Sequence, residues 1–158
     1  MAEKLDDEKF MRIALLEAQK AFKKDEVPVG CVIVKNGKII SKGHNKKEKK
    51  HCAIFHAEIV ALLGACKKLH DWRLTDCTMY VTMEPCAMCA GAILNHRVGR
   101  VVIGIAEPHF GACGGGIDLL HCLALGSNVP TQKGILAEQC LQLLQNFFKK
   151  RRDLSNKH

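Results

Sequence analysis

Apolar and polar residues follow two different rhythms along the chain, and these rhythms predict its helices and strands. Between residues 6 and 24 apolar residues recur every three or four positions, which is typical of an amphipathic helix. The runs at 27–35 and 38–44 are rich in β-branched residues. They are joined by Asn36 and Gly37, a pair that favours a tight hairpin because both turn positions readily adopt positive φ. The first 44 residues therefore predict a helix followed by a β-hairpin.

Helical and extended patterns alternate through the rest of the chain. Strands are expected at 77–83, at 100–105 and, as an edge strand, within 128–134. Helices are expected at 56–70, 86–96 and 136–150, with a weaker helical pattern at 117–125 and a turn-forming loop at 106–116. This alternation predicts the α/β class, with one mixed sheet covered by helices, in a single domain spanning residues 1–158.

Composition narrows the class of protein. Apolar residues make up 47% of the chain and charged residues 25%, which argues for a globular protein rather than a disordered one. No stretch is long and apolar enough to cross a bilayer, and the first ten residues carry acids where a secretory signal would carry bases. We therefore expect a cytoplasmic protein with no membrane partner, in which most of the nine cysteines are reduced.

The formal net charge of +8 is concentrated in two segments. Residues 42–51 hold five lysines and one glutamate, and residues 149–152 are four consecutive bases in a helix and tail that begin near residue 136. Either segment alone fits a solvated surface. Two such segments in one small domain favour a polyanionic partner.

Cys86 and Cys89 follow Pro85 at the predicted start of a helix. Their i,i+3 spacing places both sulfurs on one helix face, and the unpaired N–H groups of a helix start favour thiolates. This pair alone fits a redox couple, half of a structural zinc site or part of a catalytic zinc site.

His56 and Glu58 lie upstream of the cysteine pair and favour the catalytic alternative. Two thiolates and one imidazole form a three-ligand set that leaves the fourth position of zinc open for water. Because residues two apart do not share a helix face, we expect His56 at the very start of its helix, where Glu58 reaches the same pocket. A structural zinc site would need a fourth ligand. The candidates, none with the spacing of a zinc knot, are His44, His51, Cys52 and Cys113.

The sequence His-Ala-Glu at 56–58 followed by Pro-Cys-x-x-Cys at 85–89 resembles the signature of zinc nucleobase deaminases. The chain is moreover similar to the bacterial tRNA-specific adenosine deaminases along nearly its whole length. The stretches that carry this similarity include EVPVGCVIV, HNKKEKKHCAIFHAEI, WRLTDCTMYVTMEPCAMCAGAI, RVGRVVIG and GILAEQCLQLLQNFFKKRR. The resemblance implies the cytidine-deaminase-like fold, three α/β/α layers around a five-stranded mixed sheet, and a homodimer.

The resemblance also implies the reaction, which converts the wobble adenosine of a tRNA anticodon loop to inosine. One Zn²⁺ per subunit, held by His56, Cys86 and Cys89, would activate a water for attack on C6 of the purine. Glu58 would carry protons to N1 and to the departing amine.

The same resemblance assigns contacts to the substrate base. Asn45 would hydrogen-bond to the purine, Val29 would line the pocket, and the backbone N–H of Ala57 would donate to the base. The 106–116 loop would touch the flanking nucleotides. It departs from the family pattern, since Glu107 stands where an aspartate is common and Phe110 where a small polar residue is usual.

The C-terminal helix resembles the RNA-contacting helix of the family. Phe147 and Phe148 would stack on unpaired bases, and Arg151 and Arg152 would hold phosphates of the anticodon stem-loop. In the competing interpretation, one phenylalanine belongs to the core and the arginines are merely solvated.

Two further functions stay open at this point. One is a zinc deaminase of a free nucleobase or nucleoside, such as cytosine or guanine, which would not need the basic segments. The other is a non-catalytic, zinc-stabilised RNA-binding module, in which Glu58 would have no role.

Overall fold

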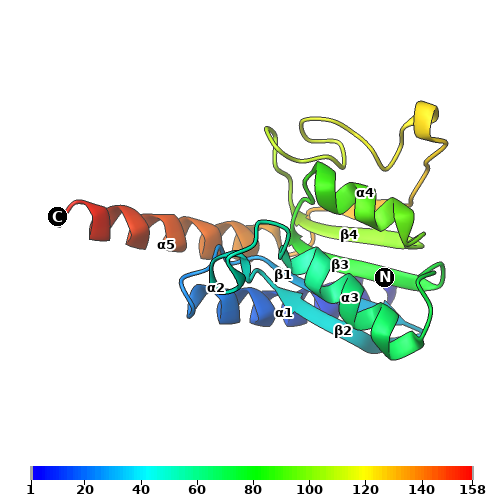
Figure 1. Cartoon of the computed structure of the whole chain (residues 1–158), viewed down its shortest axis with the longest axis horizontal. Coiled ribbons are helices and arrows are strands. Elements are labelled where there is room, and N and C mark those ends of the chain that lie inside the picture. The colour runs from blue at the N-terminus through cyan, green and yellow to red at the C-terminus, as the bar shows by residue number, and fades with distance from the viewer. Residues whose placement is uncertain (1, 158) are drawn as a thin grey trace.

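The computed structural model describes residues 2–157. They form three layers, a central sheet with helices on each of its faces (Figure 1). The five strands lie in the spatial order β2-β1-β3-β4-β5. Their bounds are β1 Gly30–Lys35, β2 Lys38–His44, β3 Cys77–Met83, β4 Arg100–Ile105 and β5 Thr131–Lys133. The helices are α1 Ala2–Phe22, α2 Lys47–Lys50, α3 Ala57–Leu69, α4 Ala87–Asn95 and α5 Ala137–Ser155, with a 3-10 turn at Leu123–Leu125. The predicted α/β class and the central five-stranded sheet are thus confirmed.

The sheet is mixed. β1 pairs antiparallel with β2 and with β3, whereas β3, β4 and β5 run parallel to one another. The predicted hairpin between β1 and β2 is present, and its turn residues Asn36 and Gly37 have φ values of 49° and 69°. A parallel β3–α4–β4 unit places the start of α4 at the carboxyl edge of the sheet, which is where ligand sites of such sheets form.

Helices cover both faces of the sheet, which explains the unbroken apolar runs of its central strands. One core cluster packs α3 and α4 against alternate strand residues such as Ile33, Met79, Val81 and Ile103. A second cluster lies on the opposite face of the sheet. There α1 and the first turns of α5 pack against the intervening strand residues Val32, Val34, Tyr80 and Val102. In the part of the chain that the structure describes, no helix is long and apolar enough to cross a membrane.

Some predicted bounds differ from the structure. The expected helix at 117–125 is reduced to the 3-10 turn, and α5 extends to Ser155 instead of ending at 150. The basic 42–51 segment overlaps the end of β2 and contains the short helix α2, which the sequence pattern did not predict. The buried carboxylate of Glu26 holds the start of α2, because it accepts hydrogen bonds from the backbone N–H groups of Glu48 (3.1 Å) and Lys49 (2.7 Å).

Candidate metal centre

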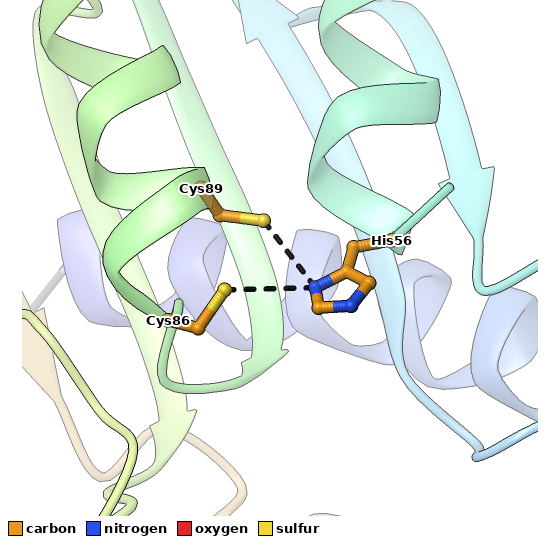
Figure 2. Close-up of side chains that lie close together, drawn as sticks. All are labelled: His56, Cys86 and Cys89. Atoms are coloured by element: carbon orange, nitrogen blue, oxygen red, sulfur yellow. Dashed lines mark hydrogen bonds between the residues drawn. The ribbon is translucent and has the colours of Figure 1, made fainter. Parts of the chain in front are cut away.

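The first residues of two neighbouring helices bring the sequence-predicted ligands together. His56 is the N-cap of α3 and has extended backbone angles (φ −71°, ψ 158°), which confirms that it lies at the very start of that helix. Cys86 is the N-cap of α4 (φ −73°, ψ 176°), and Cys89 follows in the first turn. Figure 2 shows the three side chains pointing toward one another across the gap between the two helices.

The distances among the ligand atoms match a single zinc ion. Nδ1 of His56 lies 3.6 Å from Sγ of Cys86 and 3.6 Å from Sγ of Cys89 (Figure 2). Zinc–sulfur bonds of about 2.3 Å and a zinc–nitrogen bond of about 2.05 Å at a tetrahedral angle separate nitrogen from sulfur by about 3.6 Å. Within residues 2–157 no fourth His, Cys, Asp or Glu joins this group. The residues therefore fit zinc with one position left open.

The electrostatics of the group also favour a cation. Hydrogen bonds from Cys89 and His56 lower the pKa of Cys86 to about 3. The hydrogen bond to Cys86, together with burial, raises the pKa of Cys89 well above its ordinary value. The lowered pKa of Cys86 favours its thiolate, which is the form that binds zinc. A bound zinc ion also displaces the proton of Cys89, because its thiolate ligands are deprotonated.

Glu58 is a buried carboxyl group, with 4% of its surface exposed, in the first turn of α3. Burial raises its pKa, against the opposing effects of its own backbone N–H and of His56. Its side chain lines the same pocket as His56 and Cys86, as expected from the sequence. A carboxyl group in this position can take up and release a proton beside the ligand set.

The pocket in front of the ligands has a volume of about 240 Å³. It is smaller than the roughly 300–1,000 Å³ of sites for drug-sized ligands, and its size suits one small ring system. The predicted substrate residues that line it are Val29, Asn45, Ala57 and Glu107. The pocket therefore gathers the sequence-predicted base contacts around the metal ligands.

Asn45 is held rigidly at this pocket. Its backbone N–H donates to the carbonyl of Val29 (3.2 Å), and its Oδ1 accepts from the backbone N–H of Lys47 (3.2 Å). Among residues 2–157 no hydrogen bond is seen for the carboxamide nitrogen of Asn45, so this group can donate to a ligand.

Sequence reasoning missed Glu84, which lines the pocket beside Cys86. Its carboxylate accepts three backbone hydrogen bonds, from Glu107 (2.8 Å), Cys113 (2.9 Å) and Gly115 (2.7 Å). The signal in the sequence was an acidic residue directly after a buried strand, next to Pro85. Glu84 thus joins the turn that carries the cysteines to the 106–116 loop.

Glu107 has a local role within that loop in addition to its place at the pocket. Its Oε1 accepts from the backbone N–H groups of His109 (2.8 Å) and Phe110 (3.4 Å). The side chain therefore shapes the turn that presents Phe110.

The RNA contacts predicted on α5 lie apart from the pocket residues. Phe147 is 1% exposed, and its ring packs 5.8 Å from Phe22 and 5.4 Å from Phe148. Phe148 is 45% exposed, and Arg151 and Arg152 are fully on the surface of a helix that projects beyond the sheet (Figure 1). In this conformation Phe147 serves the core, whereas the other three side chains are accessible.

Comparison with known proteins places this site in a family. The MafB19-like deaminase family matches residues 5–152. The tRNA-specific adenosine deaminase of Streptococcus pyogenes serotype M18 is 42% identical over 144 residues, which make up 91% of each chain. The protein of the same name from Bacillus subtilis strain 168 is 43% identical over 146 residues, or 92% of this chain and 91% of that one.

Solved structures agree with these relatives. A chain from biochemical and structural studies of A-to-I editing by tRNA:A34 deaminases is 34% identical, with a TM-score of 0.83 over 86% of this chain and 99% of its own. A guanine deaminase from Nitrosomonas europaea shares the fold, with a TM-score of 0.77 at 24% identity over 89% of this chain and 83% of its own. The chain therefore belongs to the tRNA-specific adenosine deaminase family, within the MafB19-like deaminases.

Proposed function

We propose that this protein deaminates adenosine to inosine at the wobble position of a tRNA anticodon loop. The observation that carries the proposal is one pocket lined by Glu58, Asn45 and two of the three side chains that could hold a metal ion. The chain is also 42–44% identical to proteins named tRNA-specific adenosine deaminase. Hydrolysis consumes adenosine and one water and releases inosine and ammonia.

His56, Cys86 and Cys89 would hold the zinc ion of the reaction. When bound, zinc supplies a Lewis acid that lowers the pKa of water toward neutrality, so that a nucleophile is available at cellular pH. The three side chains come from the starts of two helices, whose backbone sets the direction of each ligand.

Glu58 would move the protons. A carboxylate oxygen accepts a proton from the attacking water and delivers it to N1 of the purine, which makes C6 more electrophilic. Glu58 would then accept the proton of the new hydroxyl group on C6 and pass it to the exocyclic nitrogen, which departs as ammonia while C6 becomes the carbonyl carbon of inosine. The burial of Glu58 supports this role, because it raises the pKa of the carboxyl group and so makes the protonated form more accessible.

Asn45, Val29 and the backbone N–H of Ala57 would orient the base. The Asn45 amide donates to a ring nitrogen, Val29 packs against the face of the ring, and Ala57 offers one of the unpaired N–H groups at the start of α3. Phe148, Arg151 and Arg152 would contact the RNA outside the pocket.

A direct test uses the zinc-loaded protein and an anticodon stem-loop with adenosine at the wobble position. We expect inosine in the stem-loop and no turnover of free adenosine, cytosine or guanine. Glu58→Gln should keep its zinc and its RNA affinity but lose turnover by about 10²- to 10⁴-fold. Glu138→Gln, an exposed change on α5, is the matched control. Turnover of free bases alone would contradict the proposed substrate.

A homodimer, a cytoplasmic location and the organisation of residues 1–158 as a single domain stay predictions. Sedimentation of the zinc-loaded protein with and without the stem-loop tests the first of them.

A further inference from the structure

Phe110 is a large apolar side chain that lines the pocket and is nevertheless exposed to solvent. Its surface is 81% exposed, yet its ring lines the mouth of the pocket that holds Glu58 and Cys86. Exposed phenylalanine is ordinary on a surface, but an aromatic at the rim of a substrate pocket offers a flat apolar face beside the ligand.

The loop that carries Phe110 is built to hold it in place. The buried carboxylate of Glu84 binds the loop through the backbone N–H groups of Glu107, Cys113 and Gly115. Nζ of Lys133 lies 3.7 Å from the same carboxylate. The loop backbone is therefore held on both sides of Phe110 in the sequence, and this places the residue at the pocket.

Glycines make this close approach feasible. A Cβ atom at Gly111 or Gly115 would collide first with the backbone carbonyl of Glu107. At Gly111 it would also lie 2.6 Å from Cδ of Glu84, and at Gly115 it would lie 2.7 Å from Oε2 of Glu84. Side chains at either position would push the loop away from Glu84. Glycine at these two positions thus lets the loop fold closely on itself and against the carboxylate of Glu84.

We propose that the ring of Phe110 stacks on the nucleobase next to the target adenosine. This inference rests on the proposed function. A nucleotide whose base enters a pocket leaves the stack, and one face of its neighbour is then uncovered. An aromatic side chain at the pocket mouth can cover that face without reading its hydrogen-bonding edge. Phe110 thereby favours RNA that has a base next to the target over RNA that has an abasic site there.

The charge around the ring suits RNA better than a second apolar surface. Lys47 lines the same pocket, as does the acidic Glu107, and it begins the exposed segment 47–50, which holds three lysines and one glutamate. Phosphates on either side of the target nucleotide would meet these lysines while the flanking base covers the ring.

The test compares wild type, Phe110→Ala and Phe110→Trp on three stem-loops, one intact and two with an abasic site on the 5′ or the 3′ side of the target. We expect Phe110→Ala to raise KM for intact RNA by about 5- to 150-fold with kcat nearly unchanged. Phe110→Trp should restore the wild-type KM. On one of the abasic RNAs, wild type should lose the same factor and Phe110→Ala should lose nothing more. Leu123→Ala, a similarly exposed apolar residue outside the pocket, should behave as wild type.

Two results would overturn the inference. If Phe110→Ala weakens the intact and both abasic RNAs by the same factor, the ring touches neither flanking base. If Phe110→Ala changes the sedimentation of the protein without RNA, the ring contacts a second copy of the chain instead. Failure of the proposed function is seen separately, because wild type would then leave the intact stem-loop unchanged, and the inference would fall with it.

Discussion

Replacing Glu84 by glutamine tests whether one carboxylate couples the cysteine turn to the substrate loop. The side chain of Glu84 is fully buried, and its two oxygens divide three backbone donors between them. Oε1 accepts from Cys113 and Gly115, and Oε2 accepts from Glu107. A glutamine can place its oxygen at only one of these positions.

The expected cost follows from the donors left over. If the amide oxygen takes the place of Oε1, the NH₂ group faces the N–H of Glu107, and one buried donor loses its acceptor. Such a loss costs about 1–3 kcal/mol, and the two remaining bonds weaken because the acceptor is no longer charged. For a chain of this size the melting temperature should fall by about 2–12 °C.

Thermal melts of the zinc-loaded Glu84→Gln variant measure the global effect, with Glu138→Gln as the control. Amide hydrogen exchange shows which part of the chain loses stability. The amides of Glu107, Cys113 and Gly115 should exchange faster, whereas those of β1 keep their wild-type rates. A variant that melts with wild type and protects these three amides as well would refute the coupling.

Three other predictions concern the metal, the pH dependence and the RNA. Cys86→Ser should lower the zinc content measured by atomic emission and abolish deamination, whereas Cys122→Ser, outside the site, should do neither; full zinc loading of Cys86→Ser would argue against the ligand set. Burial lowers the pKa of His44 in the folded protein. As the pH drops below about 6.5, the unfolded chain therefore takes up a proton on His44 more readily than the folded protein does, and the free energy of unfolding falls. His44→Gln should make that fall in melting temperature shallower, and an unchanged slope would exclude His44 as its source. Arg151→Ala should weaken RNA binding and reduce the salt slope of log Kd by about 1, with Arg73→Ala as the control, and an unaltered slope would remove Arg151 from the phosphate contacts.

The elements of the fold that could be predicted are those whose signals are local. Strands β3 and β4 have the predicted bounds, because helices bury both of their faces and leave unbroken apolar runs. The ligand arrangement was also accessible, since Pro85 indicates a helix start and the His56 to Glu58 spacing is incompatible with a helix interior.

The parts that escaped prediction depend on backbone donors. Glu26 and Glu84 hold α2 and the 106–116 loop through N–H groups more than twenty residues away in the chain. Every residue except proline offers such a donor, so the sequence carries no mark of which ones a buried carboxylate selects. For the same reason α2 could not be distinguished from a basic loop.

The position of His56 as a helix cap has a consequence for changes in chain length. One residue inserted between His56 and Glu58 would turn the carboxyl group by about 100° around α3, since a helix has 3.6 residues per turn. The segment 70–76, which is mostly exposed, joins α3 to β3 at the end of these elements away from the ligands. Insertions there would leave His56 at the start of α3 and the two cysteines at the start of α4. Activity should therefore survive a short insertion in the exposed part of this segment and be lost on an insertion between His56 and Glu58.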